Sequence, residues 1–225
     1  MNGSLTGTSG VAVGTGTRLA GSGTIAAALS GAGLVSPGNS PGILTATQVD
    51  PTGGLDQAFE FTATGSPTYG TAAASVNDVL RLSDATTPFT TSLTAGNVID
   101  VYFDVAALAA GDTFRGGFYT DLAGDFFSSI NGATYAYWVK GNGSGTTRTF
   151  DGQGYYALAG FDPTLSVTLS TVSEAANFGG GTITGQVTQF AVVPEPGTLA
   201  LGGIAVVACL VARSRRVRVR TPGRS

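Results

Sequence analysis

The sequence predicts an all-β protein that ends in one membrane-spanning helix, and three observations support this prediction. Glycine accounts for 35 of the 225 residues and charged residues for only 11%, a composition typical of a turn-rich β protein. In residues 98–105, aliphatic or phenylalanine side chains alternate with aspartate or tyrosine side chains, which is the period of a strand packed on one face. Residues 198–212 carry no charge, and six arginines follow them. We therefore predict a solenoid-like parallel β-helix, a β-sandwich-like body and a C-terminal transmembrane helix.

Residues 1–54 have the composition of a β-solenoid. They contain thirteen glycines and only two charged residues, Arg18 and Asp50. Small groups of aliphatic residues recur between the glycines, as expected for very short strands that are joined at tight corners and stacked coil on coil. A flexible linker rich in glycine, serine and threonine is the alternative. The regular recurrence of the aliphatic residues favours the solenoid.

Residues 31–44 contain the run Val-Ser-Pro-Gly-Asn-Ser-Pro-Gly. This run resembles the autotransporter-associated β-helix repeat. The resemblance implies one coil of a parallel β-helix, with Pro-Gly and Asn-Ser at its turns and a further coil upstream. The first ten residues have neither the basic start nor the apolar core of a signal peptide. We therefore expect the natural protein to begin further upstream.

Residues 55–191 form the predicted β-rich body, in which the strands are longer. Ile99, Val101 and Phe103 share one face of the clearest strand, and Asp100 and Asp104 lie on the other. Further strands are predicted at residues 58–62, 77–82, 114–120, 133–140, 154–159, 165–170 and 182–192. Segments rich in glycine, proline, asparagine and aspartate separate these strands. Their spacing indicates a sandwich or the wider end of a solenoid.

Aromatic residues concentrate between residues 114 and 161, and most of them are expected to fill the core between sheets. Tyr137 and Trp138 carry a second hypothesis, because they precede the glycine-rich loop 141–145 and could stack on a sugar. Neighbouring residues of a strand point to opposite faces. At most one of the two rings therefore lies in the core if the other is exposed as a glycan contact.

The residue inventory limits the chemistry. Histidine is absent and the single cysteine, Cys209, lies in the apolar run, so we predict no catalytic residues that use an imidazole or a thiol and no zinc site built on them. The aspartates leave two alternatives to a solvated surface. A carboxylate pair could serve a carbohydrate-active enzyme, and Asp121 with Asp125 could form a weak calcium site. We predict no enzyme activity and no cofactor.

The last residues form a tail with three parts. Pro194 and Pro196 flank Glu195 and predict an exposed, extended segment. As a helix, residues 198–212 would measure roughly 22 Å against the ~30 Å hydrocarbon core, a deficit that arginines at residues 213–220 could reduce by reaching the headgroups. Residues 1–196 have a net charge of −9 and residues 197–225 a net charge of +6. The positive-inside rule then places the body outside the cytoplasm. A buried C-terminal helix with a basic end is the alternative.

Residues 192–220, with Pro194, Glu195 and Pro196 before an apolar run and an arginine cluster, resemble the PEP-CTERM sorting domain of Gram-negative bacteria. The resemblance implies recognition and cleavage by an exosortase, a membrane transpeptidase-like enzyme, with Arg213, Arg215 and Arg216 in the basic part of the signal. It also implies an exported protein of the cell surface or of an exopolysaccharide (biofilm) matrix. Nucleic acid is not an expected partner, because the basic end is short.

These observations lead to three hypotheses for function. The first is an exported surface or matrix protein that is structural or adhesive and has no enzyme activity. The second is a glycan-binding module that uses Trp138 or Tyr137. The third is a carbohydrate-active enzyme of the exopolysaccharide matrix.

Overall fold

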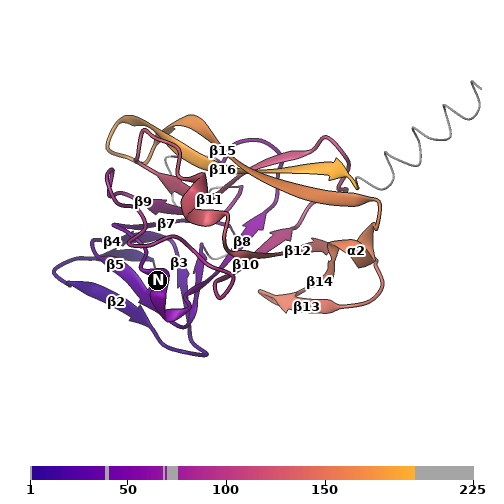
Figure 1. Ribbon diagram of the computed structural model, residues 1–225, viewed down its shortest axis with the longest axis horizontal. Helices are drawn as coiled ribbons and strands as arrows, with labels where there is room; N and C mark the ends of the chain where they lie inside the picture. The colour runs from indigo at the N-terminus through magenta and orange to yellow at the C-terminus, as the bar shows by residue number, and fades with distance from the viewer. Residues whose placement is uncertain (1, 39–40, 68, 70–75, 196–225) are drawn as a thin grey trace, which may run out of the picture.

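The computed structural model describes residues 2–38, 41–67, 69 and 76–195, and two seven-stranded sheets dominate it (Figure 1). The first sheet has the order β1 (Gly3–Leu5), β4 (Gly23–Ile25), β7 (Ile43–Ala46), β9 (Val79–Leu82), β11 (Thr113–Thr120), β16 (Thr182–Pro194) and β15 (Leu165–Asn177). The second has the order β13 (Thr147–Phe150), β14 (Gln153–Ala157), β12 (Thr134–Lys140), β10 (Val98–Phe103), β8 (Asp56–Phe61), β6 (Leu34–Pro37) and β3 (Arg18–Gly21). Three short elements complete the helical part: η1 (Pro51–Gly53), α1 (Phe127–Ile130) and α2 (Leu158–Phe161).

The chain winds in stacked turns from β1 to β12. Neighbours from β1 to β11 in the first sheet, and from β3 to β12 in the second, all pair in parallel. A third parallel ladder joins β2 (Gly10–Val13) to β5 (Ala28–Gly31), and single bridges continue it through Val49 to Phe89. Each of the first four turns of chain therefore contributes one segment to each ladder. Strand β6 lies in the predicted solenoid-like region, residues 1–54, and β8 lies in the predicted body, residues 55–191. These two strands are hydrogen-bonded neighbours, so the second sheet is continuous across the two regions.

Glycine is required where successive turns approach most closely. Gly23 has φ +141°, and a Cβ atom there would lie 2.0 Å from the carbonyl oxygen of Gly3 in the turn before it. Gly31 has φ +112°, and its Cβ would lie 2.2 Å from the carbonyl oxygen of Val13. Both positions combine a backbone conformation that L side chains rarely adopt with a backbone contact that cannot move aside. The winding therefore requires glycine at these two positions of the first 54 residues.

The main core lies inside the winding, between the ladders. Phe59, Phe61 and Phe103 from the second sheet meet Phe118 and Phe190 from the first, and all five are buried. Phe59 and Phe118 pack edge to face with their ring centroids 5.1 Å apart. This arrangement is favourable for aromatic quadrupoles and fixes the two sheets against one another.

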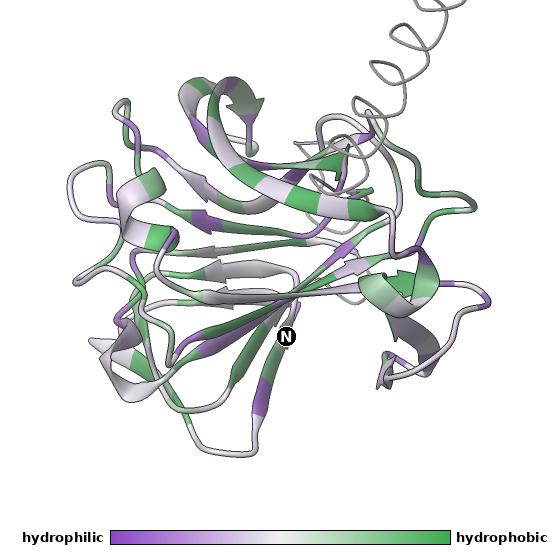
Figure 2. Ribbon diagram, turned by 45° about the vertical axis from the view of Figure 1, so that its right-hand side comes forward, coloured by the Kyte–Doolittle hydropathy of each residue, from purple (hydrophilic) through white to green (hydrophobic). Residues whose placement is uncertain are grey.

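Two antiparallel hairpins extend the ends of the sheets, β13–β14 beside β12 and β15–β16 beside β11. The β13–β14 hairpin folds over the second sheet, and Phe150 stacks on Tyr102 with centroids 4.2 Å apart. Because the sheet curls, Arg18 on β3 forms an ion pair with Asp151 in the hairpin turn, although β3 and β13 are opposite edges of the strand order. The hairpin β15–β16 is longer, and apolar and polar residues alternate along it (Figure 2).

The structure confirms the predicted all-β class, with strands dominating and only short helices among the described residues. The prediction of a β-sandwich-like body needs correction. Two sheets do face one another across one core, but their neighbours pair in parallel as far as β12, whereas sandwich strands pair antiparallel. None of the helices in the described part of the chain is long and apolar enough to cross a membrane. The predicted helix at residues 198–212 lies outside the described residues.

Candidate functional site

The C-terminal junction, residues 192–195, is built as the end of strand β16. β16 pairs antiparallel with β15 over its whole length, and the register ends with Val167 opposite Val192 and Leu165 opposite Pro194. On its other side, the Val192 amide donates to the carbonyl of Asp112 at 2.8 Å, and the Gly111 amide donates to the carbonyl of Val192 at 2.8 Å. The junction is therefore hydrogen-bonded from both sides, like an inner strand.

Glu195 is the last described residue, and its backbone continues the ladder. Its amide donates to the carbonyl of Thr164 at 2.8 Å. Thr164 is itself fixed, because its amide and its hydroxyl donate to Asp162 Oδ1 at 2.8 and 2.7 Å. The Thr164 hydroxyl and amide lower the pKa of the Asp162 carboxyl. This turn holds the start of β15 in the position that Glu195 needs.

Pro194 fits this position because of the alternation of a strand. The amides of Val192 and Glu195 point to opposite sides, toward Asp112 and Thr164 respectively. Successive residues alternate, so the nitrogen of Pro194 points to the Asp112 side, where pairing with β11 has already ended at Ala191. A missing N–H group costs nothing there. The first proline of the junction is thus compatible with pairing to β15.

The predicted exposed, extended Pro-Glu-Pro segment is only partly found. Pro194 is extended, as predicted, but Pro194 and Glu195 are half-buried rather than exposed. Pro196 and the arginines Arg213, Arg215 and Arg216 lie outside the described residues. The sequence pattern identified the segment and could not reveal that a neighbouring strand covers it.

A groove of about 460 Å³ lies beside the junction. Its wall is largely apolar and includes Leu158, Leu165 and Val167, and Glu195 contributes to its lining. Tyr137 and Trp138, the two predicted glycan contacts, also line it. The structure therefore brings both aromatic residues to the place where the described chain ends.

Tyr137 and Trp138 serve different packing layers, as expected for neighbours on a strand. The Tyr137 ring lies over the main core, 6.4 Å from the ring centroids of Phe103 and Phe190, and burial raises its pKa to about 12. Trp138 is 9% exposed and lies on the opposite face. Its indole Nε1 donates to Asp100 at 2.9 Å, and the guanidinium of Arg148 lies 4.8 Å from the ring centroid. Both rings thus have structural roles within the protein.

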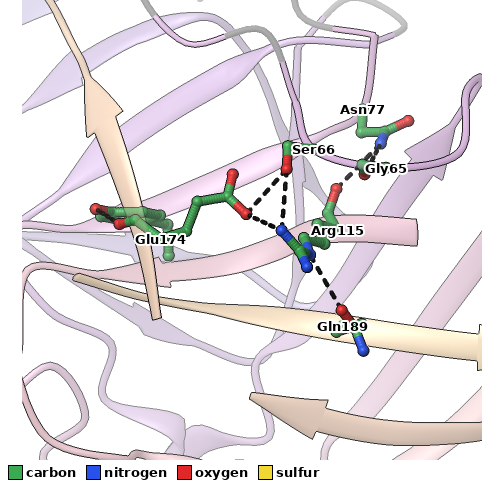
Figure 3. Close-up of polar contacts among 7 residues, drawn as sticks. Gly65, Ser66, Asn77, Arg115, Glu174 and Gln189 are labelled. Carbon is green, nitrogen blue, oxygen red and sulfur yellow. Dashed lines mark hydrogen bonds and ion pairs between the residues drawn. The ribbon is translucent and has the colours of Figure 1, made fainter. Parts of the chain in front are cut away.

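A polar cluster anchors the hairpin that carries the junction (Figure 3). Glu174 on β15 accepts hydrogen bonds from Arg115 on β11 and from the hydroxyl of Ser66, both at 3.0 Å. Arg115 also donates from Nε to Gln189 on β16 at 3.0 Å. The hydroxyl of Tyr119 donates to the backbone carbonyl of Glu174 at 3.0 Å. Side chains from three neighbouring strands therefore hold the β15–β16 hairpin against the rest of the sheet.

The carboxylates considered for metal binding or catalysis have separate partners. Asp121 forms a bidentate pair with Arg81, with distances of 3.0 and 2.6 Å. Asp125 accepts from the hydroxyl of Thr171 and the amide of Phe127, and these hydrogen bonds lower its pKa. Within the described residues, no group of three or more potential metal-ligating side chains was found. Among the described residues, the fold therefore brings no third metal-ligating side chain to Asp121 and Asp125, the weak calcium candidates.

Asp100 and Asp104, considered as a carboxylate pair, are likewise bound to different cations. Asp100 pairs with Arg148 and Asp104 with Lys140, the latter at 2.7 Å. Together with the pairs of Arg18, Arg81 and Arg115, this places every basic residue of the first 196 in an ion pair. Five of the fourteen acidic residues are thereby paired with a basic residue, and the body keeps its net charge of −9.

The residues that hold the junction were not identified from the sequence. They are Asp162 and Thr164, which form the turn before β15, and the loop residues Gly111 and Asp112. The run Asp-Pro-Thr at 162–164 is a recognisable turn signal, because an aspartate side chain readily accepts from the backbone two residues ahead. Only the fold shows that this turn lies next to the C-terminal segment.

The fold thus defines an all-β protein whose last described strand leads directly into a C-terminal segment of distinct composition. Residues 192–216 match the PEP-CTERM protein-sorting motif. The match supports an exported protein that is sorted by an exosortase and processed at its C-terminus at the membrane. No curated protein and no solved structure matches the chain. The match does not extend to residues 31–44, so the resemblance to the autotransporter-associated repeat stays a prediction.

Proposed function

We propose that the chain is a cell-surface or extracellular-matrix protein with a structural or adhesive role and no enzyme activity, delivered through its C-terminal signal. The observation that carries the proposal is the match of residues 192–216 to the sorting motif, directly after a folded β body. In this proposal residues 198–212 form the transmembrane helix, and Arg213, Arg215 and Arg216 remain on the cytoplasmic side. The exosortase supplies the chemistry of sorting.

Two features of the body support a non-catalytic role. The full sequence contains no histidine, so a general base would have to come from a carboxylate or another less suited group. Asp100 and Asp104, considered as a carboxylate pair, are each engaged by a different cation, Arg148 and Lys140, and are not arranged as two carboxyl groups facing one substrate bond. A wound β body whose basic side chains are all held in ion pairs suits a protein that presents a surface rather than one that performs a reaction.

The sorting proposal is tested by expressing the full chain behind a functional signal peptide, in cells with and without an exosortase. With the enzyme present, the protein should lose mass equal to its C-terminal tail and leave the membrane fraction. A variant with Arg213→Gln, Arg215→Gln and Arg216→Gln should be processed less, because the tail loses three of the six arginines that follow the apolar run. Identical mass and identical membrane retention in both strains would contradict the proposal.

Glycan binding is a second candidate, favoured by the groove that Tyr137 and Trp138 line beside the junction. A mixed wall of aromatic and aliphatic side chains with a carboxylate is typical of small-molecule sites. Removing Trp138 would also remove core packing, so the sharper variant is Ala159→Trp, which fills the groove from an exposed position. Polysaccharide binding that is equal in the parent protein and in Ala159→Trp would exclude this groove.

A further inference from the structure

We infer that strand β15 is a self-association surface, along which two copies of the chain pair antiparallel so that one sheet runs through both copies. β15 is the last strand of the first sheet, and among the described residues it pairs only with β16. The β15–β16 hairpin lies along the upper border of the molecule in Figure 1. The pairing is independent of sorting and adds a contact between copies to the proposed structural role.

β15 differs from the other edge strands of the two seven-stranded sheets in its length. β1 has three residues, and β3 and β13 have four each. The edges β3 and β13 are also joined, because Arg18 on β3 pairs with Asp151 in the turn that follows β13. β15 has thirteen residues. Short or covered edge strands protect a sheet against pairing with another chain, and β15 has neither protection among the described residues.

β15 also lacks the residues that usually block an edge. It contains no lysine, arginine or proline, and its ladder with β16 runs through all thirteen residues without a shift of register. Its only charged residue is Glu174, whose side chain is 9% exposed and is held by Arg115 at 3.0 Å. The edge therefore presents its backbone groups with no bulge and no exposed charge to prevent pairing.

The register with β16 shows which backbone groups of β15 point outward. The amide of Glu195 donates to the carbonyl of Thr164, so Thr164 and every second residue after it point toward β16. Residues 167, 169, 171, 173 and 175 therefore point away from β16. In the described chain, no other segment bonds to their amides or carbonyls. Each of them offers one N–H donor and one C=O acceptor to a partner strand.

A second copy of β15 fits this edge over its full length. In antiparallel pairing around a two-fold axis at Thr171, Leu169 lies opposite Ser173 of the other copy. Val167 then lies opposite Ala175. Outward amides meet outward carbonyls at each of these pairs, and the two copies form about ten hydrogen bonds. Two-fold symmetry of this kind is the commonest in homo-oligomers.

The charges and the twist of β15 are compatible with this pairing. Glu174 lies opposite Thr168 of the other copy, so the two Glu174 side chains are about 20 Å apart along the strands and do not repel strongly. Both copies have the same right-handed twist, which a pair of neighbouring strands shares. The contact is one strand wide, so we expect a reversible dimer that depends on protein concentration.

A proline at an outward amide tests the pairing. Ser173→Pro removes an outward N–H from an exposed residue and places the proline ring at the edge, a position where strands accept proline. Ser173→Ala is the matched control, because it keeps the N–H. The full chain is studied in detergent by sedimentation equilibrium, with enough salt to screen the net charge of −9 on each body.

We expect the parent protein and Ser173→Ala to form dimers, and the dimer of Ser173→Pro to be weaker by at least about tenfold. Circular dichroism verifies that all three proteins are folded. A parent protein that stays monomeric at every concentration would overturn the inference. Equal association of the parent protein and folded Ser173→Pro would also overturn it, because the contact would then lie elsewhere in the chain.

Disulfide formation between copies tests the register and does not depend on the proline variant. Thr171→Cys places two thiols at the two-fold axis, with Cα atoms about 5.5 Å apart, within the range of roughly 4.4–6.8 Å that disulfides accept. Ala175→Cys is the control on the same edge, where the two thiols lie about 27 Å apart. Both variants carry Cys209→Ser. We expect mild oxidation to give a covalent dimer of Thr171→Cys, and equal cross-linking of both variants would overturn the pairing.

Discussion

Replacing Phe190 by alanine tests how strongly the last strand is held to the core. Phe190 on β16 is 1% exposed and packs edge to face with Phe61 at 5.3 Å. It also contacts the rings of Tyr135 and Tyr137. A buried phenylalanine replaced by alanine costs about 3–5 kcal/mol, which combines lost burial with the cavity left behind. We therefore expect the free energy of unfolding to fall by about 4 kcal/mol.

The assay is thermal unfolding of the full chain in detergent, followed by circular dichroism. For a folded part of this size, about 4 kcal/mol corresponds to a decrease in Tm of roughly 8–16 °C. Thr184→Ala is the matched control, because Thr184 lies on the same strand and is exposed, and we expect a change below about 0.5 kcal/mol. A decrease in Tm for Phe190→Ala no larger than that of Thr184→Ala would refute the proposed packing of β16.

Two further predictions concern buried polar groups. Asp78 is buried, and this burial together with its neighbour Glu60 raises its pKa well above the usual value, although amides of Gly42 and Glu60 donate to its carboxyl. Because the pKa of Asp78 is higher in the folded than in the unfolded protein, its contribution to the free energy of unfolding is most favourable below about pH 4. This contribution is lost as pH rises through the folded-state pKa. As pH rises above about 4, the Tm of Asp78→Asn should therefore increase relative to that of the parent protein, and a difference that stays constant with pH would contradict this. Arg115→Met should lower stability by about 2 kcal/mol, because Glu174 keeps a largely buried charge without its cation. Adding Glu174→Met should restore part of that loss, and equal thermal unfolding of the single and double variants would show that the ion pair carries no such coupling.

The strand at residues 98–103 shows what periodicity could predict and what it could not. The sequence placed Ile99, Val101 and Phe103 on one buried face, and all three are 0% exposed in β10. The opposite face was expected to meet solvent, yet Asp100 and Tyr102 are only 8% and 2% exposed. The β13–β14 hairpin covers that face, and Arg148 on this hairpin pairs with Asp100. A local period reports one packed face and carries no information about a distant hairpin that covers the other.

The orientation of strand pairs was also beyond the sequence pattern. Alternation looks the same in a parallel and an antiparallel strand that is covered on one face, so the sequence pattern alone does not distinguish a sandwich from a parallel winding. The informative signal was glycine, since positions such as Gly23 and Gly31 are forced by close stacking of turns. That signal is dense in the first 54 residues and sparser afterwards, because the later turns have longer connections between their strands.

The candidate site was found through composition, while its structure depended on tertiary pairing. The prolines, the apolar run and the arginines identified the C-terminal segment. The partners of residues 192–195 come from residues 111–112 and 164–167, which no local pattern connects to the tail. Predicted exposure at Pro194 failed for the same reason, because burial there is supplied by β15.

Hydrogen exchange at the amides of Val192 and Glu195 tests most directly whether the sorting signal begins inside the folded sheet. Both amides donate hydrogen bonds of 2.8 Å, to Asp112 and Thr164 respectively. We predict slow exchange at Val192, comparable to inner positions of β16, and measurable protection at Glu195, which lies at the end of the ladder. Exchange at both amides as fast as in an unstructured peptide would contradict the account, because the signal would then be detached from the body.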